Sequence, residues 1–371
     1  MKKTITNLSL VLAFFLVMNA YGQTAFITNT DNTVSVINVA TNSIITTING
    51  FNNPFGVTVS RDGTRVYVVN QGNDSVFVIN TATNTVISKV LVGLSPKGCA
   101  LNFDGSVLFV TNYSEGTVSR INTATNTVTN TINVGSLPYG VVVNNVGTRA
   151  YVCNSGDTSV SVINTSTNTV IATIHVGNTP AGIAVSPDGS KVYVVNSNYN
   201  TNTVSVINTT TNMVTATIAV GTNPFEVAFT PDGTKAFVTN TSDGTVSVIN
   251  TSNNSVSSFL VSSSFYLYGI SISPDGTKAY VADGWDNTVI PINTTSYALG
   301  TPIAVGTDPQ AFGNFISTYP VTTVGINAIS TELANVSVNP NPFSSTTTMI
   351  INEGGIITML LFIYMMYLGR R

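Results

Sequence analysis

The sequence predicts an all-β fold, a seven-bladed β-propeller whose blades are four-stranded antiparallel sheets. Charged residues make up only 8% of the 371 residues, and Asn, Thr and Ser dominate the polar remainder, which favours strands and turns over helices. The two ends of the repeat array also complement each other. A strand with an aromatic residue recurs about every 42 residues, at Phe26, Tyr67, Phe109, Tyr151, Tyr193, Phe237 and Tyr280.

Each repeat carries four strand signatures. After the aromatic strand, an Ile-Asn pair ends a second strand, as at Ile79-Asn80, and a Thr-Ile-x-Val-Gly-like segment forms a third. A Pro-x-Gly segment opens the fourth strand, which leads into a Pro-Asp-Gly-like turn. Runs such as Tyr67-Val68-Val69 are apolar in succession, which is typical of a sheet covered on both faces. Blades stacked around an axis provide that cover.

The ends of the array predict how the ring closes. The first repeat starts at the strand of Phe26 and has no Pro-x-Gly strand of its own. The missing strand is found at the other end, from Pro309 to Ile316, with no Pro-Asp-Gly turn after it. We expect this C-terminal strand to join the three N-terminal strands in the seventh blade, because closure removes exposed sheet edges.

These residues resemble the YVTN β-propeller repeats of bacterial and archaeal surface proteins. Tyr67-Val68-Val69-Asn70 and Tyr193-Val194-Val195-Asn196 match the motif that names the family, and Ser186-Pro187-Asp188-Gly189 matches its turn. The resemblance covers roughly residues 24–316 and is specific because it repeats along the chain. It implies a propeller over residues 23–316 and a place outside the cell.

Residues 1–22 have the features of a signal peptide. Lys2 and Lys3 precede a short apolar run, Leu8 to Met18, and small residues precede a cleavage site before Gln23. An uncleaved anchor is the alternative, but the run is shorter than the roughly 20 residues that a spanning helix needs. We therefore expect a secreted or cell-surface protein with no membrane span in the mature chain.

The tail shows no repeat. Residues 317–335 are typical of a linker, and residues 336–371, beginning Val336-Ser337-Val338-Asn339-Pro340, resemble the start of a type IX secretion C-terminal sorting domain. The chain stops about halfway through the usual module, so we expect a partial domain. A membrane anchor over Ile356 to Leu368 is the alternative, although this run is also short for a span.

The sequence offers no catalytic centre. Its one histidine, His175, lies where other repeats carry unrelated residues, so neither a metal nor a cofactor is predicted. The recurring Asp-Gly pairs, such as Asp62-Gly63, fit hairpin turns better than calcium sites. Cys99 and Cys153 align with core valines. The net charge of -3, without a Lys/Arg cluster, argues against nucleic acid as a partner.

Comparison of the repeats points to one face of the ring as a binding surface. The Pro-Asp-Gly-like turns and the Asn-Thr turns, as at residues 80–84, share a nearly invariant face, which we call the turn face. The loops before each Pro-x-Gly strand and after each aromatic strand share the opposite, divergent face. Its candidate ligand-binding residues are Phe55, Lys97, Tyr139, Phe225, Glu226, Tyr268 and Trp285. Exposed rings stack on sugars or anchor proteins; the alternative is that these rings plug the channel mouth.

Three functions remain open at this stage. The first is a non-enzymatic binding or scaffold module for an extracellular glycan or protein. The second is a hydrolase resembling the seven-bladed lactonases, with carboxylates around a central channel, for which Glu226 is the one candidate. The third is a structural surface-layer component. Neither the ligand nor the oligomeric state follows from the residues.

Overall fold

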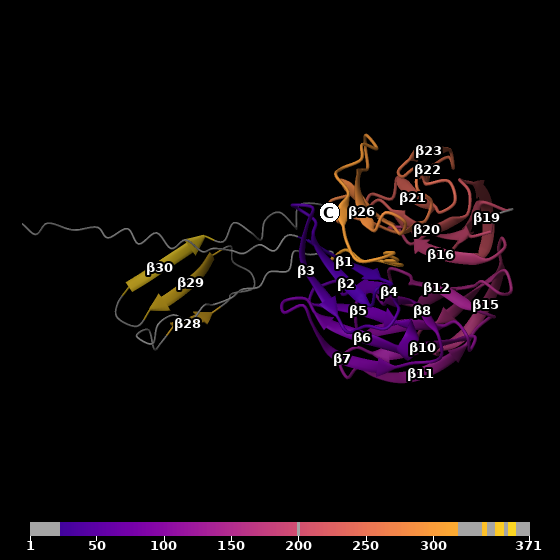
Figure 1. The fold of residues 1–371 in the computed structure, drawn as a ribbon. Helices are drawn as coiled ribbons and strands as arrows, with labels where there is room; N and C mark the ends of the chain where they lie inside the picture. Colours follow the sequence, from indigo (N-terminus) through magenta and orange to yellow (C-terminus); the bar gives the residue numbers. More distant parts are fainter. Residues whose placement is uncertain (1–22, 199–200, 318–335, 340–345, 352–354, 361–371) are drawn as a thin grey trace, which may run out of the picture. The chain divides into compact units, whose positions relative to one another are not determined.

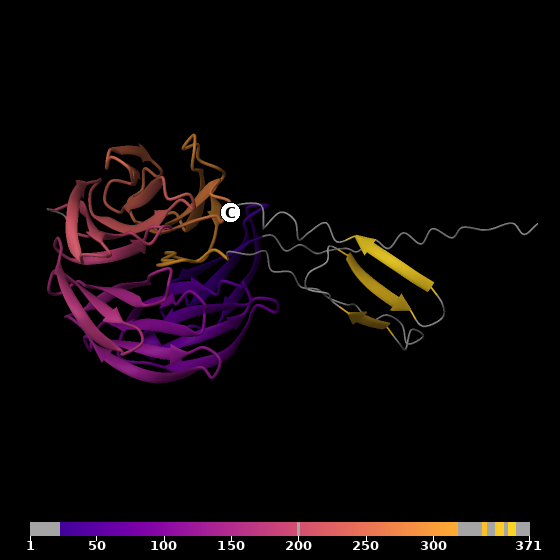
Figure 2. The ribbon, with the colours of Figure 1, turned by 180° about the vertical axis from the view of Figure 1, so that it is seen from behind.

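The computed structural model describes residues 23–198 and 201–317, together with three strands between residues 336 and 360. Residues 23–317 form seven antiparallel β-sheets, arranged as blades around a central axis (Figures 1 and 2). The predicted all-β, seven-bladed propeller is therefore confirmed. In the described residues, helix is confined to the 3-10 turn η1 (Gln71–Asn73).

Six blades are continuous four-stranded sheets. The first three comprise β4 (Pro54–Val59), β5 (Arg65–Asn70), β6 (Ser75–Asn80) and β7 (Thr85–Leu91); β8 (Pro96–Leu101), β9 (Val107–Asn112), β10 (Thr117–Asn122) and β11 (Thr127–Asn133); and β12 (Pro138–Val143), β13 (Arg149–Asn154), β14 (Ser159–Asn164) and β15 (Thr169–His175). The next three comprise β16 (Pro180–Val185), β17 (Lys191–Asn196), β18 (Thr203–Asn208) and β19 (Met213–Ala219); β20 (Pro224–Phe229), β21 (Lys235–Asn240), β22 (Thr245–Asn250) and β23 (Val256–Leu260); and β24 (Leu267–Ile272), β25 (Lys278–Asp283), β26 (Thr288–Asn293) and β27 (Ile303–Ala304).

The seventh blade joins the two ends of the propeller, as the sequence predicts. Its three N-terminal strands are β1 (Thr24–Asn29), β2 (Thr33–Asn38) and β3 (Ser43–Asn49). Residues 309–317 lie antiparallel to β1: the backbone N–H of Phe26 donates to the carbonyl of Phe315 (2.9 Å), and that of Gln310 to the carbonyl of Thr28 (2.8 Å). This pairing supplies the inner edge of the blade.

The core lies between neighbouring blades. The seven recurring aromatic residues are at most 2% exposed, and both faces of the strands that carry them are covered. Cys99 and Cys153 are buried and unpaired, as their alignment with core valines predicts. His175 lies exposed at the end of the outermost strand β15.

The recurring Asp-Gly pairs form hairpin turns on the turn face. In the first blade, Asp62 Oδ1 accepts hydrogen bonds from Ser60 Oγ (2.6 Å) and from the backbone N–H of Thr64 (3.0 Å). Gly63 has a φ of 70°, a left-handed conformation that favours glycine. The hydroxyl of Thr81, from the second turn of the same blade, donates to the Gly63 carbonyl (2.6 Å). The two turn sets therefore share one face, as predicted.

Basic residues at the start of the aromatic strands link neighbouring blades. Arg65 Nη1 donates to the carbonyl of Thr123 in the next blade (2.7 Å), and Lys191 Nζ donates to the carbonyl of Thr251 (3.0 Å). Arg149, Lys235 and Lys278 make the equivalent contact. Several of the 13 Lys and Arg residues are therefore part of the scaffold.

The first strands of successive blades approach closely around the axis. A Cβ atom at Gly56, Gly98, Gly140, Gly182 or Gly269 would collide with a backbone carbonyl of the next first strand or of the closing segment. Glycine at these five positions therefore permits the close approach of the first strands. At the same position in β20 the chain carries Glu226.

We expect Gly140→Ala to lower the free energy of unfolding by about 1–3 kcal/mol, the usual cost of inserting a methyl group into packed structure. The added methyl group would meet the carbonyl oxygen of Ala181 and lie 3.0 Å from Cγ2 of Ile183. Urea denaturation followed by far-UV circular dichroism measures the change. An unaltered midpoint would contradict the close approach of β12 and β16.

The chain divides into two compact units, and the second begins after residue 323. In it, β28 (Val336–Asn339), β29 (Thr346–Ile351) and β30 (Gly355–Leu360) form a three-stranded antiparallel sheet in that order. The predicted signal peptide (1–22) and most of the predicted linker (317–335) lie outside the described residues, as do residues 361–371 of the predicted sorting domain.

Candidate functional site

The structure brings four of the predicted ring residues together at the centre of the propeller. The Tyr139 ring meets the rings of Phe55 and Phe225 edge to face, with centroids 5.8 and 6.1 Å apart. Phe225 in turn meets Tyr268 at 5.4 Å. Phe312 completes this group, which we call the aromatic cluster: Phe55, Tyr139, Phe225, Tyr268 and Phe312.

The aromatic cluster is more buried than the sequence predicts. Phe55 is 7% exposed, and Tyr139, Phe225 and Tyr268 are half-buried against one another. The expectation of an exposed ring is therefore wrong for Phe55, because blade closure brings side chains from opposite sides of the ring into contact. This packing is what the alternative interpretation, a plug of the channel mouth, predicts for these rings.

Phe312 is a member of the cluster that the repeat pattern does not reveal. Its ring centroid lies 5.2 Å from that of Tyr139 and 5.6 Å from those of Phe55 and Phe225. The residues on both sides of it have positive φ, 45° at Ala311 and 106° at Gly313. The signal in the sequence is small: a phenylalanine stands where other repeats carry residues such as Val57.

Lys97 lies beside the cluster. Its Nζ donates to Oε1 of Gln71 (3.0 Å) and lies 4.3 Å from the ring centroid of Phe55, a cation–π contact. Burial lowers the pKa of Lys97 to about 8, so the amine is mostly protonated at pH 7. The cluster therefore carries a positive charge at its edge.

Trp285 and Tyr266 form a second, exposed aromatic feature on the divergent face. The two rings stack in parallel, with centroids 5.8 Å apart and planes 8° apart, and their exposed fractions are 64% and 43%. Tyr266 also lies 6.2 Å from Tyr268, so this stacked pair continues into the aromatic cluster. The repeat pattern does not reveal Tyr266, whose φ of 81° is unusual for a bulky residue.

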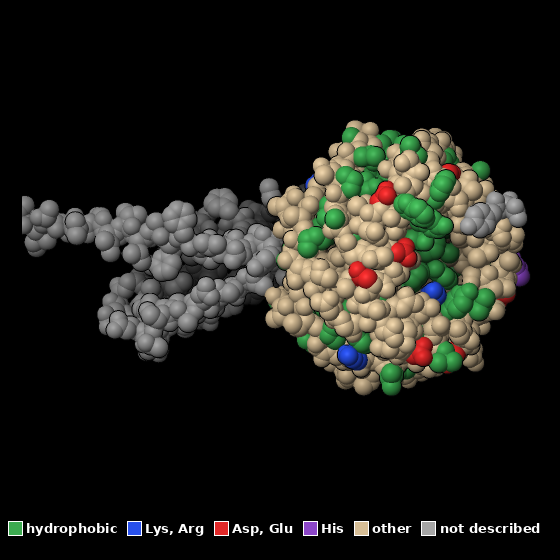
Figure 3. Space-filling view, in the orientation of Figure 1, with side chains coloured by type: hydrophobic (Ala, Val, Ile, Leu, Met, Phe, Trp, Pro, Cys, Tyr) green, Lys and Arg blue, Asp and Glu red, His purple; other side chains and the backbone are tan. Residues whose placement is uncertain are grey.

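Polar groups adjoin the stacked pair in the chain. Ser264 and the Asp286 carboxylate adjoin it in the chain, with the Ser264 hydroxyl 3.4 Å from Asp286 Oδ1. In the view of Figure 3, hydrophobic side chains gather in a strip across the middle of the propeller, among mostly uncharged polar side chains. The stacked pair thus offers flat apolar surface together with hydrogen-bonding groups.

Glu226 does not lie with the exposed rings. It is 4% exposed and lines a cavity of about 470 Å³ whose walls come from the first strands of several blades and from residues 313 and 314. The backbone N–H groups of Val227 and Gly313 face the carboxyl group. Burial nevertheless dominates and raises the pKa of Glu226 to about 8. The carboxyl group is thus mostly protonated at neutral pH.

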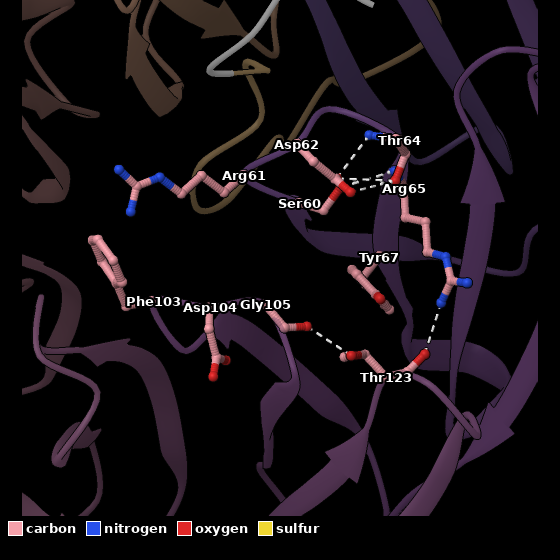
Figure 4. Close-up of a pocket in the computed structure, with 10 residues that line it drawn as sticks. All are labelled: Ser60, Arg61, Asp62, Thr64, Arg65, Tyr67, Phe103, Asp104, Gly105 and Thr123. Carbon is pink, nitrogen blue, oxygen red and sulfur yellow. Dashed lines mark hydrogen bonds between the residues drawn. The ribbon is translucent and has the colours of Figure 1, made fainter. Parts of the chain in front are cut away.

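A larger pocket, of about 530 Å³, lies on the turn face between the first two blades (Figure 4). The Arg61 guanidinium lies 4.0 Å from the ring centroid of Phe103, and Arg65 bonds the Thr123 carbonyl. Asp62 is held by Ser60 and Thr64 within its turn. The polar groups here mainly bond one another, so this pocket is explained by the blade junction.

The described residues contain no group of three or more His, Cys, Asp and Glu side chains that could hold a metal ion. In the same residues we find no helix with the length and apolar character that a membrane crossing requires.

Comparison with solved structures supports the fold. Hydrazine synthase from Kuenenia stuttgartiensis matches with a TM-score of 0.65 and 20% identity, covering 83% of this chain and 96% of that one. A functionally unknown protein from Desulfotomaculum acetoxidans DSM 771 matches with a TM-score of 0.67 and 15% identity, covering 79% and 100%. At such identities the likeness shows the fold alone.

The match to a family model covers a shorter part of the chain. The model of the YNCE-like β-propellers matches residues 143–243, which span most of the third blade, all of the fourth and part of the fifth. No curated protein matches the chain. Taken together, the repeats, the seven blades and the YNCE-like match support a β-propeller of the YVTN type.

Proposed function

We propose that the protein is a secreted or cell-surface binding module that recognises a glycan through the stacked pair of Trp285 and Tyr266, without catalysing a reaction. The observation that carries the proposal is the exposure of the two parallel rings, 64% and 43%, on the divergent face. Aromatic rings left in water on a stable scaffold provide large contact areas at low conformational cost.

The neighbourhood of the stacked pair favours a sugar over a protein. Asp286 follows Trp285 in the chain and Ser264 lies two residues before Tyr266, and their carboxylate and hydroxyl contact each other. A bound pyranose could stack its apolar face on the rings while these groups bond its hydroxyls. A protein partner would use the same rings as anchors. The aromatic cluster packs against the stacked pair, because the Tyr268 ring contacts both Tyr266 and Phe225.

The single tryptophan provides a direct test. Trp285 is the only tryptophan in the chain, so its fluorescence reports events at the stacked pair. We expect a glycan array to identify a ligand that shifts this fluorescence, and Tyr266→Ala to weaken its binding at least tenfold, about 1.4 kcal/mol or more. Trp285→Ala should weaken binding similarly when affinity is measured by calorimetry.

Phe103→Ala is the matched control, because Phe103 is 53% exposed but lies on the turn face. Affinity unchanged in both stacked-pair variants would refute the site. If the rings bound a protein and no glycan, the partner of this site would be a protein and not a sugar. A screen of lactone and glycoside hydrolysis separates the binding module from a lactonase-like enzyme.

The extracellular location in this proposal rests on the signal-like residues 1–22, and the route rests on the resemblance of residues 336–371 to a type IX sorting domain. N-terminal sequencing of the exported protein tests the first point. A mature chain that begins at Gln23 supports it, and an intact Met1 contradicts it.

A further inference from the structure

The central cavity lined by Glu226 is separate from the stacked pair. Besides strand residues, its lining includes Asn145 and Pro187, which lie in turns of the turn face, and it includes none of the rings of the aromatic cluster. The cavity thus extends toward the turn face. Its volume of about 470 Å³ is in the range of sites for small molecules.

The walls of the cavity are mainly apolar. Val141, Ile183 and Ile270 line it from three different blades, and Phe229 adds an aromatic ring. Among the polar groups, the Ser271 hydroxyl donates to Asn314 Oδ1 (3.1 Å), so these two side chains already partner each other. A ligand of compact apolar shape would fit these walls.

Glu226 supplies the one carboxyl group in this lining. The backbone N–H of Val227 donates to Oε1 (3.4 Å) and that of Gly313 faces the carboxyl group, but Oε2 is buried and makes no hydrogen bond of good geometry. No Lys, Arg or His lines the cavity. A buried carboxyl oxygen that lacks a partner is costly unless a ligand or solvent satisfies it.

The other titratable groups near Glu226 do not compensate its charge. Cys99, from β8, lines the cavity, and Tyr139 and Cys153 lie within electrostatic range of the carboxylate. Burial raises the pKa of all three, so they are neutral at pH 7. An ionised Glu226 would therefore have no cationic partner within the cavity lining.

We propose that the cavity binds a small organic cation, a primary or quaternary amine with a compact apolar body, and that the Glu226 carboxylate is its counter-ion. A primary ammonium would donate a hydrogen bond to Oε2, a quaternary one would pair with the carboxylate by charge alone, and the apolar walls would cover the carbon atoms of either. A single carboxylate is too few ligands for a divalent metal.

Binding is coupled to proton release. Because the pKa of Glu226 is about 8, the empty site is mostly protonated at pH 7, and each bound cation displaces one proton to solvent. For tetramethylammonium, which does not titrate, the association constant should rise about tenfold from pH 6 to pH 7 and level off above pH 8.

Isothermal titration of the full chain with tetramethylammonium chloride tests the proposal, at constant ionic strength between pH 6 and pH 9. We expect the stated pH profile, release of one proton at pH 7, loss of binding in Glu226→Gln, and no binding of the neutral isostere tert-butanol. Phe103→Ala, at an exposed residue outside the cavity lining, is the matched control and should bind as the unaltered protein does. The probe differs from the glycan ligand of the stacked pair, so failure here is distinguishable from failure of that site.

Three outcomes would overturn the proposal. If Glu226→Gln bound tetramethylammonium with the affinity of the unaltered protein, the Glu226 carboxylate would not be the counter-ion. Affinity that does not rise between pH 6 and pH 8 would show that the ionised Glu226 carboxylate is not the counter-ion. Absence of binding by the unaltered protein at every pH would leave the cavity as a water-filled channel only. The pH profile of the unaltered protein does not depend on whether the variant folds.

Discussion

Phe315→Ala is expected to lower the free energy of unfolding by about 3–5 kcal/mol, as for a central core residue. Phe315 is fully buried and packs in the core shared by the seventh and first blades. Its carbonyl also accepts the backbone hydrogen bond from Phe26 that closes the ring. Guanidinium denaturation followed by tyrosine fluorescence and circular dichroism measures the change.

Phe265→Ala is the matched control, because Phe265 is 55% exposed and should change stability by less than about 0.5 kcal/mol.

Deleting residues 309–317 altogether should abolish cooperative unfolding, since β1 and β4 would each lose backbone partners. A stable, cooperative protein after this deletion would show that the ring does not depend on the closing segment.

Glu226→Gln is expected to remove most of the pH dependence of stability between pH 5 and pH 8. Burial raises the pKa of Glu226 from 4.5 to about 8, so between these values the folded protein keeps a proton that the unfolded chain releases. Stability therefore falls as pH rises through this window, by roughly 3–4 kcal/mol between pH 5 and pH 8. The amide of glutamine does not titrate, so the variant should be the more stable protein at pH 8.

The pH window suits this measurement. His175, the one histidine, is exposed, and the lowered pKa of Lys97, about 8, affects stability mainly above the window. Urea denaturation of both proteins at pH 5, 6.5 and 8 gives the difference directly. Parallel stability curves for the two proteins would contradict the burial of a protonated Glu226.

Much of the fold was predictable because each blade repeats its local chemistry. The period of the aromatic strands, the Asp-Gly turns and the complementary ends predict seven blades and their closure. The exposed position of His175 and the buried positions of Cys99 and Cys153 also follow, because alignment between repeats transfers burial from one blade to the next.

The candidate sites were less predictable, because they combine residues from blades that are distant in the sequence. Phe312 reaches the rings of Phe55 and Phe225 only in the closed ring, and Tyr266 stacks on Trp285 through a loop whose backbone the repeat pattern does not specify. The exposed character expected for Phe55 was wrong for the same reason.

The sequence by itself determined the strands, their order, the invariant turn face and the position at which Glu226 replaces glycine, since these depend on contacts within one repeat. Only the tertiary structure decided that Glu226 lines the central cavity and that the inner rings pack together while Trp285 stays exposed. The physical reason is that whether a side chain points toward the axis or toward solvent depends on the closed ring, and no single repeat contains that ring.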